Sequence, residues 1–243
     1  MHQLYPELAD IDPFDAYGRP ARRDGRPSVR LNMIASIDGA AYLSGRSGAL
    51  GGPADKALFA TLRSLADVIL VGAATVRVEG YGPARLDPAA RARRQRLGLA
   101  TTVPIAVVTR SCRLDWTSPF FTAAEARPLV VTASSSNAGD RAVASEVAEV
   151  ILAGRDDVDL SAAVGALGER GYDSILAEGG PGIAAQLAVA GLLDEVCLTL
   201  SPMLAAGDAR RILDGPAVVP PVRLELAGVL TADSYLFLRY RHP

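Results

Sequence analysis

Histidine is nearly absent from this sequence. The two histidines, His2 and His242, lie at the two ends of the 243 residues. No internal histidine is present to complete a Ser-His-Asp triad, a Cys-His pair or a His-based metal site. Any chemistry must therefore come from carboxylates, hydroxyls or a bound cofactor. Hydride transfer suits such a chain because the cofactor supplies the reactive atom and the protein orients it.

Cysteine, long apolar runs and excess positive charge are also scarce. Cys112 and Cys197 are too few for a disulfide scaffold or a structural zinc site. No apolar run approaches the roughly 20 residues that cross a bilayer, and the first residues lack the apolar stretch of a signal peptide. The net charge of −2 opposes nucleic acid as a main partner, and the basic run 91–96 is interpreted as the wet face of a helix. We expect a cytoplasmic protein that binds a small molecule, without a nucleic-acid or membrane partner.

Short apolar segments alternate with helical patterns along the chain. Strands are predicted at 29–37, 67–71, 104–109, 128–132, 149–152, 174–178, 195–201, 223–229 and 235–240, and helices at 53–65, 159–170 and 181–190. This alternation predicts an α/β fold with a mostly parallel sheet, helices on both faces and a C-terminal antiparallel hairpin at its edge. We expect an irregular N-terminal arm over residues 1–27 and one domain over 28–243.

Glycines and small residues follow two of the predicted strands, where open α/β sheets bind ligands. Gly72 ends one strand and is followed by Ala-Ala-Thr75, which opens a helical turn whose free N–H groups favour a phosphate. An ordinary strand-to-helix turn explains that segment equally well. Glu178 ends another strand directly before Gly179-Gly180 and the helix start at Pro181, which places a carboxylate at the mouth of a cleft.

A third strand ends in Thr109-Arg110-Ser111. Two hydroxyls around a guanidinium recognise phosphate well, and the 2′-phosphate of NADPH is a natural ligand there. None of the three segments is a GxGxxG fingerprint, which opposes an ordinary Rossmann dehydrogenase but leaves a nucleotide-binding reductase open.

Four motifs occur in a fixed order: Ser-x-Asp-Gly at 36–39, LRSLADVILVGAAT at 62–75, EGGP at 178–181 and LLDEVCLTLSPML at 192–204. In this order they resemble the reductase domain of bacterial riboflavin biosynthesis, a pyrimidine reductase family with the dihydrofolate reductase fold. The resemblance covers roughly residues 28–240. It implies a homodimer without the zinc deaminase domain that bifunctional members carry.

The resemblance also implies roles for individual residues. Those expected at the NADPH site are Ala35, Ser36, Gly72, Thr75, Glu79, Thr109, Arg110, Ser111, Gly179, Gly180, Pro181, Gly182 and Ile183. Those expected to contact the substrate are Ser47, Arg63, Arg85 and Glu178. The loop before Arg85 reads EGYGPAR and departs from the family pattern, so the family's phosphate-binding arginine is matched there only by position.

In that family NADPH delivers a hydride to C1′ of a 5-amino-6-ribosylamino-pyrimidinedione 5′-phosphate in its open, imine form. Asp38, Glu178 and water are the candidate proton sources in this chain. A carboxyl group donates near neutral pH only if burial raises its pKa. Asp38 serves equally well as a cap of the turn at Gly39.

Two other functions remain open at this stage. Dihydrofolate reduction on the same fold needs a carboxylate on the first helix, where this chain has only Asp55 in the first turn and Arg63 farther along. An arginine suits a phosphate better than a pterin ring, which favours the pyrimidine phosphate over a pterin-like substrate. The other function is non-catalytic nucleotide binding, which the retained Ser36, Asp38 and Glu178 oppose.

Overall fold

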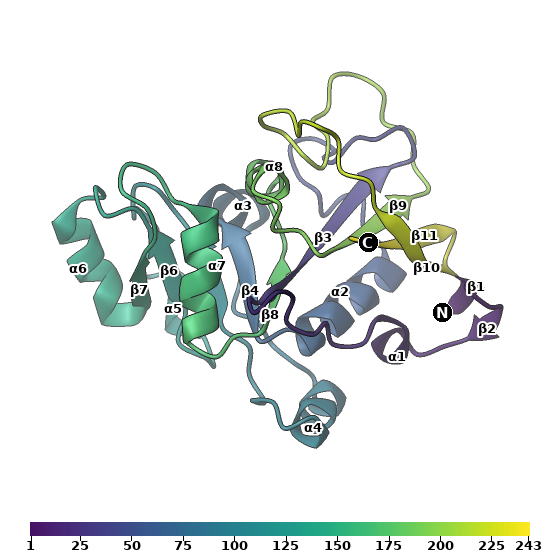
Figure 1. Cartoon of the computed structure of the whole chain (residues 1–243), viewed down its shortest axis with the longest axis horizontal. Coiled ribbons are helices and arrows are strands. Elements are labelled where there is room, and N and C mark those ends of the chain that lie inside the picture. Colours follow the sequence, from purple (N-terminus) through teal and green to yellow (C-terminus); the bar gives the residue numbers. More distant parts are fainter.

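One twisted sheet runs through the whole molecule (Figure 1). The computed structural model describes residues 1–243, and the strand order is β2-β1-β10-β11-β9-β3-β8-β4-β5-β6-β7. The strands are β1 His2–Tyr5, β2 Ala9–Asp10, β3 Ser28–Ser36, β4 Val68–Gly72, β5 Ile105–Val108, β6 Leu129–Thr132, β7 Glu149–Leu152, β8 Ser174–Ala177, β9 Glu195–Ser201, β10 Glu225–Ala232 and β11 Tyr235–Arg241. All pairs from β9-β3 to β6-β7 are parallel, and the pairs β9-β11, β11-β10, β10-β1 and β1-β2 are antiparallel.

The helices are α1 Pro13–Tyr17, α2 Pro53–Leu65, α3 Ala73–Glu79, α4 Pro88–Arg96, α5 Pro119–Thr122, α6 Ala138–Val147, α7 Leu160–Glu169 and α8 Pro181–Val189. They lie on both faces of the parallel half, with α3 and α5 on one face and α7 and α8 on the other. No helix is both long and apolar enough to cross a membrane. The mostly parallel α/β sheet with a C-terminal antiparallel hairpin is confirmed.

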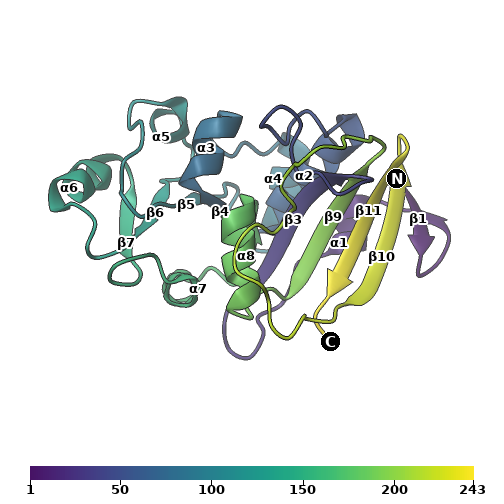
Figure 2. The same ribbon diagram turned by 90° about the horizontal axis from the view of Figure 1, so that it is seen from above.

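The alternation of side chains along β4 shows how the two faces form. Ile69 and Val71 belong to the core that α2, α3 and α5 cover, whereas Val68 and Leu70 belong to the core under α7 and α8. A strand that is buried on both faces is apolar at every position. Figure 2 shows α3 and α8 on opposite sides of the end of β4.

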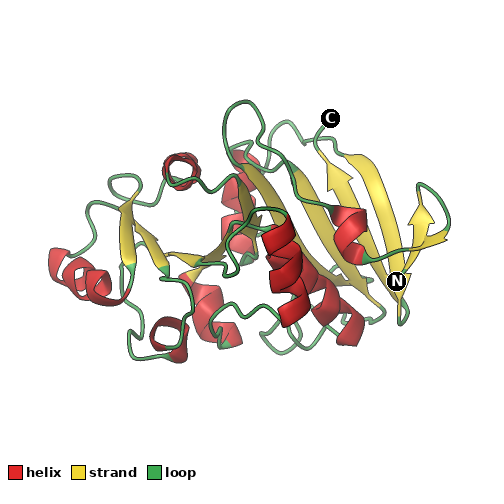
Figure 3. Cartoon of the chain, turned by 90° about the horizontal axis from the view of Figure 1, so that it is seen from below, coloured by secondary structure: helices red, strands yellow, loops and turns green.

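The antiparallel half is covered on one face only. The helices α1 and α2 lie against it when seen from below (Figure 3), whereas no helix covers β9, β10 and β11 when seen from above (Figure 2). The outward positions of β9 and β11 are apolar and partly exposed: Val196, Leu198, Leu200, Leu236, Leu238 and Tyr240. An exposed apolar sheet face of this kind is typical of a surface that binds another protein.

The expectation of an irregular N-terminal arm is wrong in part. His2–Tyr5 forms β1, which pairs with β10 and extends the sheet. Arg30 and Arg239 then donate to backbone carbonyls at the end of α1, at Tyr17 and Ala16. The sequence did not predict this strand because it is only four residues long and its pairing partner, β10, lies near the other end of the chain.

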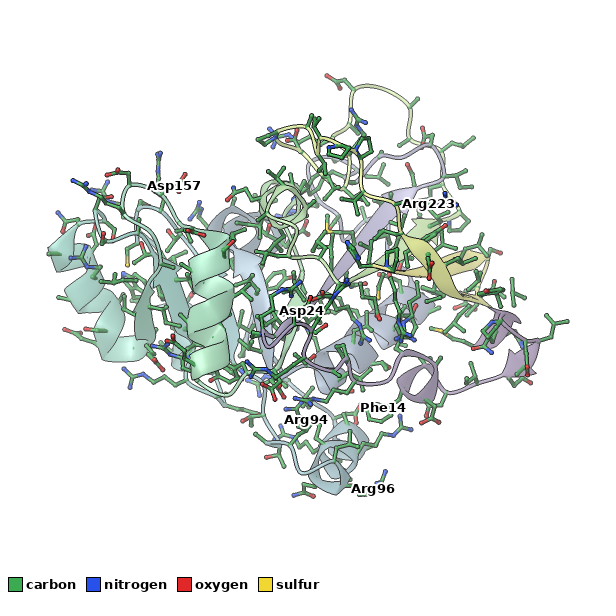
Figure 4. The ribbon with its side chains drawn as sticks, in the orientation of Figure 1. Phe14, Asp24, Arg94, Arg96, Asp157 and Arg223 are labelled. Atoms are coloured by element: carbon green, nitrogen blue, oxygen red, sulfur yellow. The ribbon has the colours of Figure 1, made fainter.

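The basic run at 91–96 lies on α4, which is at the lower edge of Figure 4 with Arg94 and Arg96 labelled. Arg96 is exposed, as expected, but Arg94 is only 1% exposed. Its guanidinium donates to the carbonyls of Ser64, Ala66 and Ala100, and so ties α4 to the end of α2. The run is therefore a solvent-facing helix with one buried structural arginine.

Candidate functional site

Two cavities meet at the carboxyl ends of the parallel strands. A cleft of about 940 Å3 follows the ends of β4 and β5 and the start of α8. A smaller cavity of about 210 Å3 lies between β3, the start of α2 and Glu178. Four residues line both: Tyr42, Thr75, Glu79 and Gly180. A ligand in the cleft and a second one in the small cavity would therefore touch at this junction.

The cleft fits an extended ligand with phosphate groups because the backbone approaches it without side chains. A Cβ atom on Gly180 would come within 2.6 Å of Thr75 Oγ1, and one on Gly72 within 3.1 Å of the Ile183 side chain. The α8 helix begins at Pro181, and Gly180, Pro181, Gly182 and Ile183 line the cleft. Free N–H groups at this helix start favour a pyrophosphate.

The far end of the cleft continues into a polar cavity of about 280 Å3 that has no hydrophobic lining residue. Arg110 and Ser111 line both spaces, and Thr109 lines the cleft beside them. Arg113, Ser135, Ser136 and Asn137 add further polar groups, and two carboxylates, Asp140 and Asp156, line the cavity as well. Arg113 pairs with Asp140 at 3.1 Å, which leaves Arg110 as the unpaired cation of this lining. Arg110 and the neighbouring hydroxyls suit a phosphate at the end of a nucleotide.

The smaller cavity is lined by carboxylates and one cation. Its polar side chains are Asn32, Tyr42, Ser47, Asp55, Lys56, Thr75, Glu79, Tyr81 and Glu178. Ser47 donates to Glu79 Oε1 from both its backbone nitrogen (2.7 Å) and its hydroxyl (2.9 Å). Lys56, in the first turn of α2, is the single lysine or arginine of this lining and takes part in no ion pair.

Three donated hydrogen bonds hold the Glu178 carboxylate in place. Arg63 donates to it twice, from Nε to Oε1 at 2.7 Å and from Nη2 to Oε2 at 2.8 Å, and the Tyr81 hydroxyl donates to Oε2 at 2.9 Å. The guanidinium lies 4.2 Å above the Phe59 ring. Burial, followed by the Glu178 charge, raises the pKa of Tyr81 well above its ordinary value, so Tyr81 remains a donor.

Arg63 and Arg85 do not lie where the resemblance implied. Arg63 lines neither cavity, because the bidentate pair with Glu178 uses its guanidinium behind the wall. Arg85 also lines neither cavity, and its side chain is 64% exposed and 3.9 Å from Glu125. Neither arginine can be assigned as a substrate contact in this conformation.

Asp38 lies outside both cavities, contrary to its interpretation as a catalytic acid. Its carboxylate accepts hydrogen bonds from Ser36 Oγ (2.5 Å) and from the backbone nitrogens of Ala205 and Ala206. The Ser36 hydroxyl, and then these two N–H groups, lower the pKa of Asp38 to about 2. The ionised group fastens the loop 205–210, which forms one wall of the cleft.

The other residues expected at the site fall into two groups, those that line a cavity and those that lie behind its lining. Gly72, Thr75, Glu79, Thr109, Arg110, Ser111, Gly180, Pro181, Gly182 and Ile183 line the cleft, and Ser47, Glu79 and Glu178 line the small cavity. Ala35, Ser36 and Gly179 line neither. Ala35 and Ser36 are buried in β3, and the Gly179 carbonyl accepts from Gly72 at 2.7 Å. These three residues shape the site from below its surface.

The sequence did not indicate Tyr42, Lys56, Tyr81 or the loop 205–210 as parts of the site. Lys56 had a usable signal, because it follows Pro53 in the first turn of a helix that starts beside the Ser-x-Asp-Gly segment. Asp55 was noted but not placed in the site, yet it lines the small cavity, where burial raises its pKa against an opposing hydrogen bond from Thr199. The loop 205–210 had no readable pattern.

Known proteins are similar to this chain in sequence and in fold. The 2,5-diamino-6-ribosylamino-4(3H)-pyrimidinone 5′-phosphate reductase of Methanothermobacter thermautotrophicus is 30% identical over 221 residues, which cover 88% of this chain and 98% of that protein. The crystal structure of a pyrimidine reductase-like protein from Corynebacterium diphtheriae is 31% identical with a TM-score of 0.77, covering 88% of this chain and 91% of that one.

A dihydrofolate reductase from Enterococcus faecalis is similar in fold alone, with 14% identity, a TM-score of 0.50 and coverage of 90% of this chain and 98% of that one. The dihydrofolate reductase-like fold implied by the resemblance is thereby confirmed. The family model described as the RibD C-terminal domain matches residues 27–238, nearly the whole chain. This chain therefore belongs to the RibD C-terminal domain family.

Proposed function

We propose that this protein is an NADPH-dependent reductase of a ribosylamino-pyrimidine 5′-phosphate, acting in riboflavin biosynthesis. The observation that carries the proposal is the junction of the two cavities, which brings a cofactor cleft and a carboxylate-lined cavity together at Tyr42, Thr75, Glu79 and Gly180. The relative named above, a reductase of such a phosphate, aligns over 98% of its own length.

NADPH, when bound, supplies the hydride. Gly72 and Gly180 carry no side chain that would block the bound dinucleotide. The start of α8 faces its pyrophosphate. Arg110 and Ser111 contact the 2′-phosphate that distinguishes NADPH from NADH. Asp38 keeps the cleft wall closed by holding the loop 205–210. The cofactor preference thus rests on the phosphate-binding chemistry of one strand end.

In the small cavity Glu178 orients the pyrimidine. Because Arg63 and Tyr81 fix its carboxylate in place, it presents a rigid acceptor to the N–H groups of the ring. Lys56 is the cation available to the 5′-phosphate, in the role that the displaced Arg85 leaves open. A Glu178→Gln variant should lose mainly kcat, and Lys56→Ala should raise mainly the KM for the phosphorylated substrate.

Dihydrofolate reduction is the second candidate, and Asp55 is the observation that favours it. Its carboxyl group lines the small cavity on the first helix, where it could pair with the amino-pyrimidine edge of a pterin. The test is NADPH oxidation, followed by absorbance, with the ribosylamino-pyrimidine phosphate and with dihydrofolate side by side. Faster turnover of the pyrimidine phosphate supports the first proposal. Faster turnover of dihydrofolate supports dihydrofolate reduction instead. If neither compound causes NADPH oxidation, the protein is a non-catalytic nucleotide-binding protein.

The protein is also proposed to form a homodimer in the cytoplasm. The apolar sheet face of β9 and β11 supports the dimer, because a second copy would remove it from water.

A further inference from the structure

We propose that Tyr42 is the proton donor of the reduction. The inference rests on the proposed function, because it assigns the acid that accompanies hydride transfer at the same junction. Neither of the carboxylates considered from the sequence fills this role: Asp38 lies outside both cavities, and Glu178 is engaged as a carboxylate by Arg63.

The junction offers three polar side chains. Glu79 accepts both donors of Ser47 at its Oε1 atom, and Thr75 carries an aliphatic hydroxyl, which is a far weaker acid than a phenol. Tyr42 lines both cavities and its hydroxyl makes no hydrogen bond within the protein. The phenolic oxygen lies 3.4 Å from where a Cβ atom of Gly180 would stand, and so against the floor where the two spaces join.

The backbone holds Tyr42 firmly in this position. Leu43 and Arg46 exchange two backbone hydrogen bonds of 3.0 Å around Ser44-Gly45, whose positive φ angles of 50° and 80° suit a tight two-residue turn. On its other side Ala41 donates to the Arg210 carbonyl at 2.9 Å. A donor that is fixed on both sides needs little reorganisation when the proton moves.

The proton remains on Tyr42 at neutral pH. Partial burial, and then the negative charge of Glu79, raise the pKa of its hydroxyl, with Asp214 acting in the same direction and Arg210 against it. The other charged or titratable groups are Asp55, Lys56, Tyr81 and Glu178 in the small cavity and Arg77, Arg110 and Asp208 in the cleft. The group is therefore an acid throughout the physiological range.

The step balances as follows. A hydride adds to the carbon of the substrate C=N bond, the π electrons move to nitrogen, and nitrogen forms a bond to the proton as the O–H bond of Tyr42 breaks. The substrate gains two electrons and the dinucleotide loses them. The resulting phenolate recovers its proton from water, which reaches this half-buried side chain through the open cleft.

The test is Tyr42→Phe, which removes only the hydroxyl. General acid catalysis contributes about 10²- to 10⁴-fold, so kcat should fall by at least about a hundredfold while NADPH binding stays at the wild-type level. The residual rate should rise as the pH falls, and small buffer acids should restore part of it, because solvent must supply the proton. A residue with a merely structural role would show neither effect.

Equilibrium binding of the reduced product gives a readout that is independent of turnover. Loss of one hydrogen bond should weaken product binding to Tyr42→Phe by roughly three- to tenfold. Tyr172→Phe is the matched control: it removes the hydroxyl of a partly buried tyrosine that lines neither cavity, and its turnover should keep the wild-type pH dependence.

Three results would overturn the assignment. They are a Tyr42→Phe enzyme with kcat near the wild-type value, a residual rate with the pH dependence of the wild type, or a pH-dependent acid rescue that appears in Asp55→Asn instead. A wild-type protein that reduces no pyrimidine phosphate would overturn the proposed function itself, and this assignment with it.

Discussion

Arg63 on α2 and Glu178 at the end of β8 are joined by two parallel hydrogen bonds of 2.7 and 2.8 Å across 115 residues of sequence. The carboxylate is 1% exposed and the guanidinium 15% exposed, so the pair is buried. Bidentate geometry and the third donor, Tyr81, satisfy the carboxylate where an unpaired charge would be costly. Arg63 thus positions the acceptor of the small cavity and does not itself reach the cavity.

Replacing Arg63 should destabilise the protein strongly. Arg63→Met leaves the Glu178 charge buried without its main partner, at a cost of about 3–5 kcal/mol in the free energy of unfolding. The double variant Arg63→Met/Glu178→Gln should recover part of this loss, since no charge remains. Urea denaturation measures both, and Arg170→Met, in an exposed pair with Glu149, should cost only about 0–1 kcal/mol. If Arg63→Met and Arg170→Met lowered the free energy of unfolding equally, the buried pair would have no special structural role.

Removing Asp38 should loosen the wall of the cofactor cleft. Asp38→Ala deletes the acceptor of the Ala205 and Ala206 N–H groups, so NADPH affinity should fall while the fold persists. Because the pKa of Asp38 is lowered from 3.8 to about 2, the anchor is complete above its ordinary value and is lost only as pH falls through about 2. Asp38 should therefore produce no limb in a pH–rate profile near neutrality.

Asp159→Ala is the matched control for this experiment. Asp159 also accepts two backbone N–H groups, those of Ser161 and Ala162, but at the start of α7, away from the cleft. Titration of NADPH by fluorescence should show weakened binding in Asp38→Ala alone. Wild-type affinity in Asp38→Ala would remove the anchoring role.

Arg110 should set the preference for NADPH over NADH. Its loss removes a charge-assisted contact with the 2′-phosphate worth about 1.5–3 kcal/mol, which corresponds to roughly a ten- to hundredfold preference. Arg110→Ala should erase most of that ratio and leave the NADH kinetics nearly unchanged. Arg96→Ala, on the exposed side of α4, should alter neither. A wild-type protein that uses both cofactors equally well would refute this role.

Asp55 should make stability depend on pH in an identifiable way. Burial raises its pKa, so stability is complete below the ordinary value of 3.8 and declines as pH rises through the raised pKa and the carboxyl ionises. Asp55→Asn removes this decline. The variant should therefore gain Tm over the wild type at neutral pH and lose that gain in acid. A constant difference in Tm across this range would mean that Asp55 does not titrate at a raised pKa.

A charge placed on the apolar sheet face should separate the proposed dimer. Leu238→Lys puts an ammonium group in the middle of the face that β9 and β11 present, whereas Val143→Lys places the same charge on α6, at an exposed position far along the sheet. Light scattering should report a monomer near 25.3 kDa for Leu238→Lys only. A wild-type monomer would refute the dimer directly.

The sequence by itself determined the elements and the ends of strands at which ligands meet the protein. Proline at position 53, the Asp159 cap and Pro181 each mark a helix start within one residue, because these signals act within a single turn. The apolar runs of β4, β5 and β8 predicted a parallel sheet buried on both faces for the same local reason. Glu178, Thr75 and Arg110 lie at the cavities because parallel strands bring their carboxyl ends to one edge.

Only the tertiary structure decided what each side chain does there. Arg63 is not among the residues that line the cavity, because Glu178, 115 residues later, engages its guanidinium. Asp38 has no catalytic role because its carboxylate oxygens accept hydrogen bonds from N–H groups of a loop 167 residues away. Lys56 and Tyr42 line the small cavity because a helix start and a tight turn meet there beside Gly180. Such pairings join segments distant in sequence, and their partners are fixed by the packing of the whole sheet, which no local pattern encodes.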